Sequence, residues 1–303
     1  MKVFMTGATG FVGSYVVSAA LEAGHEVQIL ARHASLRKLP PAVQKNPNLK
    51  IFDGDLRFPK TLVGAGEGCE AVIHLVGIID EDPEEGITFE TMHVQATRHA
   101  TDIARRVGAK RFLHMSALGT RHFAESLYHR SKYEAESIVK ACGVPYVIFR
   151  PSVIFGRGDG FVNAQAAIIH SFLPVPVLGN GRNQLQPVAV ENVADGIVKA
   201  LTNDSCLNKI YEIGGPDRLT LDEITERVVQ AKGSKALLNI HIPIGLLKPP
   251  VKFMHAIFRG FPLNEDKVIM AGEESVCDAG PFNRDFGITP RPFTVEALRA
   301  YIG

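Results

Sequence analysis

The sequence has few cysteines, and their spacing suggests no shared site. The four cysteines lie far apart among 303 residues and form no Cys-x-x-Cys pair. This absence argues against a structural zinc site, a redox-active dithiol and a disulfide framework. Reduced thiols of this kind are typical of a cytosolic protein, so we expect a cytoplasmic location.

Two signatures of hydrolytic chemistry are also missing. The sequence contains no His-Glu-x-x-His, and His93 and His99 are six residues apart, so we expect no metal site. It contains no Gly-x-Ser-x-Gly, which would place a nucleophilic serine on a sharp turn. Zinc-dependent and serine-dependent hydrolysis are therefore not expected.

The chain lacks both a charge excess and a long hydrophobic run. Its 33 Lys and Arg residues oppose 32 Asp and Glu residues, so no large basic face is available for nucleic acid. The longest apolar stretch, residues 71–79, is interrupted by His74 and falls short of the roughly 20 residues that span a bilayer. The first apolar run breaks at Gly7, too early for the core of a signal peptide. We expect neither membrane insertion nor export.

Short apolar runs alternate with longer amphipathic segments through the first half of the chain. This alternation predicts an α/β fold, a doubly wound parallel sheet of the Rossmann type with helices on both faces. We expect strands at residues 3–5, 27–30, 71–76, 111–115 and 146–149, and helices at 12–23, 91–107 and 127–141.

Glycine and proline become frequent beyond Pro151, which indicates loops and a second lobe. We expect residues 1–155 plus 188–215 to form a dinucleotide-binding domain, and residues 156–187 plus 216–303 to form a smaller α/β lobe for the substrate. A strand at residues 211–213 is expected to return to the main sheet. Thr220-x-x-Glu223 is typical of a capping box that opens a helix.

A glycine-rich loop lies directly between the first expected strand and helix. Gly7 permits a tight turn, Gly10 lets the backbone approach a pyrophosphate, and Gly13 allows close packing of helix on strand. The alternative is a plain strand-to-helix turn, but this position favours dinucleotide binding. We expect the loop to bind the cofactor through Gly7, Thr9, Gly10, Phe11, Val12 and Gly13.

The end of the second strand discriminates between two coenzymes. A carboxylate there would bind the adenosine ribose of NAD(H), whereas a cation would pair with the 2′-phosphate of NADP(H). The chain has no carboxylate at this point and carries Arg32, whose planar guanidinium suits a phosphate. We therefore expect NADP(H) in preference to NAD(H); the alternative is that Arg32 is an ordinary surface cation.

Several motifs together resemble the extended short-chain dehydrogenase/reductase superfamily, whose members include NAD-dependent epimerase/dehydratase-like proteins. The segments that carry the resemblance are Thr6–Gly13, Gly54–Leu56, His74–Gly77, Tyr128-x-x-x-Lys132 and Arg150–Gly156. Residues 126–132 and 154–159 are most similar to the atypical branch that contains the dinucleotide-binding accessory subunit of respiratory complex I.

The resemblance implies further contacts with the cofactor. It places Asp55 and Leu56 beside the adenine, and Val76 and Gly77 beside the adenosine-side ribose. It places Pro151, Ser152 and Val153 beside the nicotinamide, and Tyr128 and Lys132 at the nicotinamide ribose.

Tyr128 and Lys132 are spaced for joint chemistry. Residues four apart on a helix share one face, and a nearby ammonium would lower the pKa of the phenol. Tyr128 is then expected to be the general acid or base for a substrate hydroxyl while hydride moves to or from nicotinamide. The alternative is that the two residues have no joint role, because a tyrosine followed four residues later by a lysine is common on exposed helices.

Two positions depart from the family pattern. The family's catalytic hydroxyl aligns with Ala117, so Ser116, which we expect to bind the substrate oxygen, comes one residue early. His93 stands where family enzymes usually have an asparagine that serves a proton relay.

These observations leave two functions open. The first is an NAD(P)-dependent oxidoreductase or epimerase/dehydratase acting on a small molecule, a sugar nucleotide or another carbonyl compound. The second is an NADP(H)-binding structural or redox-sensing module of a larger assembly, without turnover. Residues 237–261 are strongly apolar and form either core or a docking surface for a protein partner.

Overall fold

A seven-stranded parallel sheet forms the centre of the molecule in a computed structural model that describes residues 1–235, 238–245 and 264–302. The strand order is β11-β6-β5-β4-β1-β2-β3, and every neighbouring pair is parallel. The strands are β1 (Lys2–Thr6), β2 (Glu26–Leu30), β3 (Leu49–Phe52), β4 (Ala71–His74), β5 (Arg111–Met115), β6 (Tyr146–Pro151) and β11 (Lys209–Ile213).

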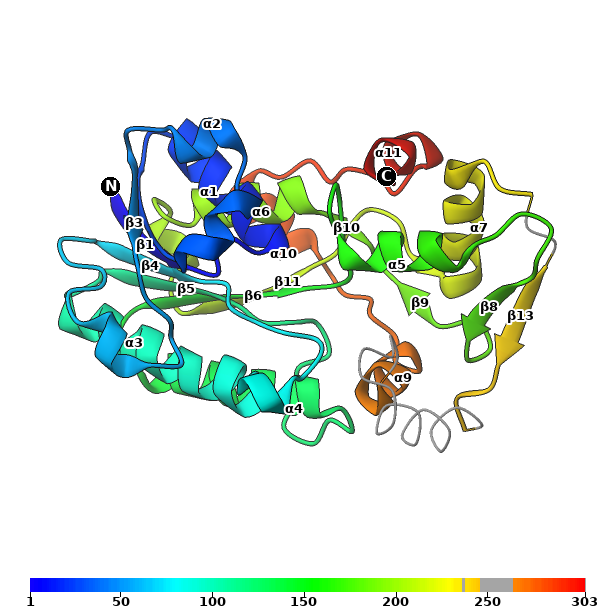
Figure 1. The fold of residues 1–303 in the computed structure, drawn as a ribbon, viewed down its shortest axis with the longest axis horizontal. Coiled ribbons are helices and arrows are strands. Elements are labelled where there is room, and N and C mark those ends of the chain that lie inside the picture. Colours follow the sequence, from blue (N-terminus) through cyan, green and yellow to red (C-terminus); the bar gives the residue numbers. More distant parts are fainter. Residues whose placement is uncertain (236–237, 246–263, 303) are drawn as a thin grey trace.

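Helices cover both faces of this sheet, as Figure 1 shows. Alternate residues of β1 separate the two layers, because Val3 and Met5 enter one hydrophobic core and Phe4 enters the other. The doubly wound α/β prediction is confirmed. One layer consists of α1 (Phe11–Glu22), α2 (Pro41–Gln44), α6 (Val190–Lys199) and α10 (Gly280–Phe286), and the other of α3 (Ala96–Arg106) and α4 (Leu127–Ala141).

Smaller elements gather at one end of the sheet (Figure 1). Helices α5 (Gly160–Ile168), α7 (Leu221–Lys232) and α11 (Val295–Tyr301) accompany three two-stranded ladders. The ladders pair β7 (Ile154–Phe155) with β10 (Val188–Ala189), β9 (Gln184–Leu185) with β12 (Leu219–Thr220), and β8 (Val175–Leu178) with β13 (Asn239–Ile242). A short helix, α9 (Glu265–Ala271), lies between this end and α4.

The C-terminal half contributes to both regions. The predicted strand at residues 211–213 does return to the main sheet as β11, and Thr220 and Glu223 form the predicted capping box of α7. Helix α10 packs its Phe282 and Phe286 against Phe149 and Tyr211 of the main sheet. The two-lobe division at the boundaries given above remains a proposal; it assigns α10 to the smaller lobe, although α10 packs on the main sheet.

The helix expected over residues 91–107 begins differently. Residues Glu90–Gln95 form a π-helical turn, η4, before α3 starts at Ala96. The Thr97 hydroxyl donates to the His93 carbonyl, and such side-chain bonding competes with the regular backbone pattern. The wider turn is a feature often found at functional sites, and it carries His93.

The described residues contain no helix that is long and apolar enough to cross a membrane. Within the same residues, no group of three His, Cys, Asp or Glu side chains could hold a metal ion. All four cysteines are free, buried thiols. The apolar stretch 237–261 lies mostly outside the described residues, so its expected role as core or docking surface is not tested.

Candidate nucleotide-binding and catalytic site

The glycine loop joins β1 to α1, and close packing requires two of its glycines. Gly7 adopts φ +77°, and a Cβ there would lie 2.7 Å from the Leu75 carbonyl carbon at the end of β4. A Cβ at Gly13 would lie 2.0 Å from the Gly7 carbonyl oxygen. Side chains at either position would therefore push the strand and helix apart.

Gly10 has a different environment and is the position that suits a ligand. It is exposed at the N-cap of α1, and a Cβ there would meet only the Gly7 carbonyl oxygen, at 3.3 Å. No side chain among the described residues caps the helix at Gly10, while Phe11 packs edge-on against Tyr15. The first-turn N–H groups of a helix lack intrahelical acceptors and favour an anion, so this cradle fits a pyrophosphate. The cofactor roles expected for Gly7, Thr9, Gly10, Phe11, Val12 and Gly13 stay predictions.

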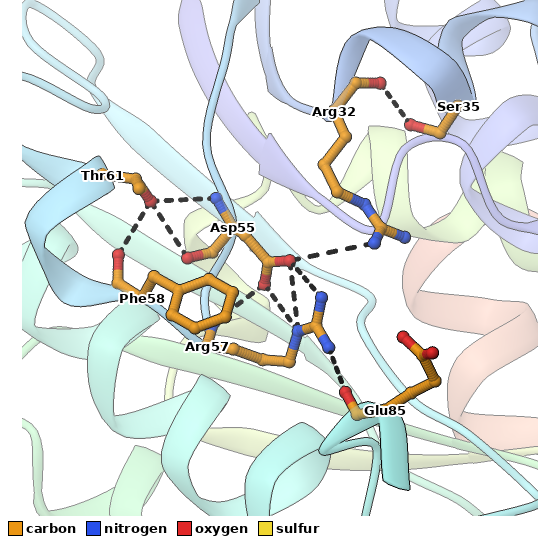
Figure 2. A network of polar contacts seen from close by, with 7 residues as sticks. All are labelled: Arg32, Ser35, Asp55, Arg57, Phe58, Thr61 and Glu85. Carbon is orange, nitrogen blue, oxygen red and sulfur yellow. Dashed lines mark hydrogen bonds and ion pairs between the residues drawn. The ribbon is translucent and has the colours of Figure 1, made fainter. Parts of the chain in front are cut away.

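Three charged side chains meet where β2 and β3 end, as Figure 2 shows. The Arg32 side chain is 63% exposed, and its Nη1 lies 4.0 Å from Asp55 Oδ2. Asp55 is held much more closely by Arg57, with Nη2 2.7 Å from Oδ2. Burial opposes ionisation of Asp55, but hydrogen bonds from Arg57 outweigh it and hold the pKa of Asp55 below its ordinary value.

The next expected cofactor residues line the strand ends in different ways. Leu56 is buried in the core that underlies α3, and its carbonyl oxygen lies 2.7 Å from His99 Nδ1. Val76 is partly buried against the same core. Gly77 directly adjoins the catalytic candidates, because a Cβ there would lie 3.0 Å from Lys132 Nζ and 3.6 Å from His93 Nε2.

Lys132 is buried on α4 and points its ammonium toward the ends of β4 and β5. Its Nζ donates to the Met115 carbonyl at 3.1 Å. Burial disfavours the charged form and lowers the pKa of Lys132 to about 8. An ammonium with one backbone acceptor retains protons for another partner, as a ribose-binding role requires.

Tyr128 is partly buried among aromatic rings at the start of α4. Its ring lies edge-on to Phe89 and His93, with centroids 6.0 and 5.5 Å away. Its hydroxyl makes no hydrogen bond to any of the residues that the structure describes. Burial raises the pKa of Tyr128 to about 12, whereas we expected Lys132 to lower it, so that expectation is wrong for the chain's own side chains.

His93 connects the loop after β4 to α4. Its Nε2 accepts the Ile78 N–H at 3.0 Å, so the neutral ring carries its proton on Nδ1, which lies 2.8 Å from Ser131 Oγ. Ser131 Oγ in turn donates to the Tyr128 carbonyl at 2.8 Å. Burial lowers the pKa of His93 to about 2, so the ring is neutral across the physiological range. It packs edge-on against the Tyr128 ring and hydrogen-bonds Ser131 on the same helix.

The Ser116 hydroxyl has hydrogen-bond partners inside the protein. Its hydroxyl lies 3.2 Å from Thr120 Oγ1 and hydrogen-bonds Glu136, which also forms a bidentate pair with Arg150. None of the hydrogen bonds among the described residues joins Ser116 to Tyr128 or Lys132. The expected role of Ser116 in binding substrate oxygen stays a prediction.

The segment that we expect to contact the nicotinamide lies at the C-terminal end of β6. Ser152 Oγ lies 2.9 Å from Ser275 Oγ and 2.8 Å from the Ser275 carbonyl oxygen, which links the main sheet to the C-terminal part of the chain. The Val153 carbonyl accepts the Val188 N–H. Pro151 is buried at the end of the strand. The roles of Pro151, Ser152 and Val153 at nicotinamide remain predictions.

Helix α9 accepts hydrogen bonds from the start of α4 through Asp266. Asp266 accepts the backbone N–H groups of Leu127 and Tyr128 at 2.8 and 2.7 Å, and the Ser126 hydroxyl at 3.0 Å. One residue later, Lys267 Nζ lies 2.7 Å from Asp80 in the loop after β4. Helix α9 therefore joins the start of α4 to the loop after β4.

The sequence-based reasoning did not assign functional roles to Arg57, Asp266 or Phe89. Arg57 follows Asp55 by two residues, a local signal that could have been noticed. Asp266 is 138 residues from Tyr128, and no local pattern connects them.

A parallel sheet with a glycine cradle at its first strand-to-helix turn, and a Tyr-x-x-x-Lys pair beyond its fifth strand, defines a dinucleotide-binding Rossmann protein. The family model "NAD dependent epimerase/dehydratase family" matches residues 3–214. The chain belongs to this family.

Curated relatives include NADH dehydrogenase (ubiquinone) 1 alpha subcomplex subunit 9 of Rattus norvegicus, 30% identical over 97% of this chain and 79% of the relative. The Mus musculus counterpart is 32% identical over 73% of this chain, which corresponds to only 59% of that protein's length. The ceramide reductase of Caulobacter vibrioides is 31% identical over 65% of this chain and 59% of its own.

A solved structure agrees on the fold. UDP-glucuronic acid 4-epimerase from Bacillus cereus, in complex with UDP-glucuronic acid and NAD, superimposes with a TM-score of 0.72. The two are 17% identical, and the match covers 99% of this chain and 98% of the epimerase. At this identity the likeness concerns the fold alone.

Proposed function

We propose that the protein is an NADP(H)-dependent oxidoreductase that reduces a carbonyl group. The observation that carries this proposal is the Tyr128 hydroxyl, which makes no hydrogen bond within the described structure and whose pKa burial raises to about 12. A phenol of this kind is protonated at neutral pH and suits a proton donor better than a base. Reduction of a carbonyl requires such a donor at the oxygen.

The other residues of the candidate site would each have a separate role in binding the coenzyme. NADP(H) supplies hydride when bound. Gly10 and the first turn of α1 would hold the pyrophosphate, and Lys132 would bind the nicotinamide ribose through its remaining protons. Tyr128 would donate its proton to the substrate oxygen. The same two residues support the broader epimerase/dehydratase assignment, in which the phenol acts in both directions.

The preference for NADP(H) rests on Arg32. Its exposed guanidinium stands where a carboxylate would favour NAD(H). The Bacillus cereus epimerase holds NAD, so the coenzyme of this chain is a property to be measured separately. The four free, buried thiols support the cytoplasmic location that we include in the proposal.

The substrate class is a small carbonyl compound. The Caulobacter relative is named a ceramide reductase, and the epimerase of similar fold binds a sugar nucleotide. We propose to screen both classes, long-chain ketones and nucleotide-linked keto sugars, with NADPH oxidation as the signal.

The test compares two tyrosine variants of α4. Tyr128→Phe should lower kcat by a factor of about 10² to 10⁴ while leaving the dissociation constant of NADPH nearly unchanged, as the loss of a general acid predicts. Tyr133→Phe is the matched control, because Tyr133 has Ser137 rather than a lysine four residues on. Equal rates for Tyr128→Phe and the wild type would refute the proposal.

A second candidate function has one structural observation in its favour. Helix α9 bonds both to the start of α4 and to Asp80, and so forms a hydrogen-bonded closure between these two segments. A module that keeps NADP(H) as a structural or redox-sensing ligand would have such a closure, and the rat relative is named as a subunit of a larger enzyme. Coenzyme that co-purifies and fails to exchange with added NADPH would support this alternative.

A further inference from the structure

Arg57 is fixed beside Asp55 more firmly than an ordinary surface cation. The two side chains are only 15% and 16% exposed. Arg57 Nε lies 3.1 Å from each carboxylate oxygen, and its Nη2 lies 2.7 Å from Oδ2. Its Nη1 donates to the Glu85 carbonyl at 2.6 Å, and the guanidinium carbon lies 5.3 Å from the centre of the Phe58 ring. Figure 2 shows the Arg57 guanidinium between the Asp55 carboxylate and the Glu85 carbonyl.

The same carboxylate is also within reach of Arg32. Asp55 Oδ2 lies 4.0 Å from Arg32 Nη1, but no hydrogen bond joins these two side chains within the described structure. If Asp55 had no other partner, it would pair with Arg32 and repel any anion that approached. With Arg57 in place, two guanidinium groups surround one carboxylate, so the cluster keeps one net positive charge.

Two other carboxylates, Asp53 and Glu85, also lie at this edge, and the charge of Glu85 acts on Arg57. Asp53 is the second carboxylate here, but it lies 3.4 Å from His33, and both side chains are largely exposed. Glu85 contributes its backbone carbonyl to Arg57. The exposed member of the cluster is Arg32, so the positive charge is presented to solvent there.

We infer that Arg57 sets the coenzyme preference by neutralising Asp55, which leaves the Arg32 guanidinium available to the 2′-phosphate of NADP(H). The inference rests on the proposed function, because it concerns the adenosine end of the same site. Arg57 acts through Asp55 and does not touch the phosphate. It is therefore a positioning residue for coenzyme selection.

A double-mutant cycle tests this relationship by binding alone, without a substrate. NADPH and NADH dissociation constants are measured by fluorescence titration for the wild type, Arg57→Gln, Asp55→Asn and the double variant. Arg57→Gln should weaken NADPH on the order of tenfold and change NADH little, because the unpaired Asp55 carboxylate would repel the 2′-phosphate, which NADH lacks. Adding Asp55→Asn to Arg57→Gln should restore most of the NADPH affinity.

Two further variants complete the design. Lys60→Gln removes an exposed charge three residues from Arg57 without touching Asp55, and should leave both affinities as they are. Arg32→Gln should weaken NADPH in every background. Thermal melting of each variant establishes that it is folded before its affinity is compared.

The possible outcomes distinguish a failure of the role inferred for Arg57 from a failure of the proposed function. A double variant as weak toward NADPH as Arg57→Gln would overturn the inference, because Arg57 would then act on the phosphate directly. An unchanged ratio of NADPH to NADH affinity in Arg57→Gln would overturn it as well. A wild type that binds neither nucleotide would remove the proposed function, and the inference with it.

Discussion

The Nε2 atom of His93 accepts the backbone N–H of Ile78 at 3.0 Å. This bond fixes the tautomer of the ring, so that Nδ1 carries the proton toward Ser131 on α4. The loop that follows β4 and the helix that presents Tyr128 are thereby tied together by one buried side chain.

His93→Phe should destabilise the protein by about 1 to 3 kcal/mol, because the buried Ile78 N–H loses its acceptor while the ring contacts with Phe89 and Tyr128 persist. Urea denaturation measures the change. His93→Asn should recover part of the loss, since an amide oxygen is able to accept the same N–H. Equal losses in the two variants would show that ring packing, not hydrogen bonding, is what His93 provides.

His114→Phe should have the opposite effect. Both ring nitrogens of His114 are buried between Phe112 and His74, with no hydrogen-bond partner among the described residues. Replacing such a ring with an apolar one of similar shape should raise the free energy of unfolding by about 1 to 2 kcal/mol. The matched control is His74→Phe, which should destabilise, because the His74 nitrogens bond Thr6 and Thr97. A loss of stability in His114→Phe would indicate a partner that the described contacts do not contain.

Stability should fall as the pH decreases below about 6.5, the ordinary pKa of histidine. Burial lowers the pKa of His74 to about 3 and that of His93 to about 2. Between those values and 6.5, the unfolded chain binds protons that the folded chain does not, at a cost of about 1.4 kcal/mol per pH unit for each histidine. Urea denaturation at pH 7.5, 6.5 and 5.5 measures the slope, and a flat profile over this range would contradict the burial of neutral rings.

Asp266→Ala should cost about 2 to 3 kcal/mol, because two backbone N–H groups and one hydroxyl at the start of α4 lose a charged acceptor. Thermal or urea unfolding measures the loss. Asp102→Ala is the control: within the part of the chain that the structure describes, its carboxylate pairs only with Arg105 on the exposed surface of α3, so the change should stay within about 0.5 kcal/mol. Similar effects of the two substitutions would show that α9 does not support α4.

The fold was accessible from the sequence because local patterns determined it. The apolar runs that became β1, β2, β5 and β6 are short and buried, and the glycine spacing at Gly7 and Gly13 reflects packing contacts that leave no room for a Cβ. Residues that act within a few positions of each other, such as Thr220 and Glu223, were also found.

The candidate site was harder to predict from the sequence, because burial and long-range contacts set its properties. The spacing of Tyr128 and Lys132 gave no indication that the enclosing rings of Phe89 and His93 would raise the pKa of the phenol. The position of Ser116 did not reveal its bond to Thr120 or its place beside Glu136. Such effects depend on which side chains the fold brings together, and a single sequence does not record that.

The dependence of α4 on Asp266 has a consequence for how the chain matures during synthesis. The first turn of this helix is completed by a carboxylate that leaves the ribosome about 140 residues later, at roughly 5 to 20 residues per second. For those seconds, the Leu127 and Tyr128 N–H groups lack this acceptor, although Ser126 already caps the helix. All seven strands of the main sheet thus precede Asp266 in synthesis, while the reactive tyrosine acquires its final placement only when the last part of the polypeptide arrives.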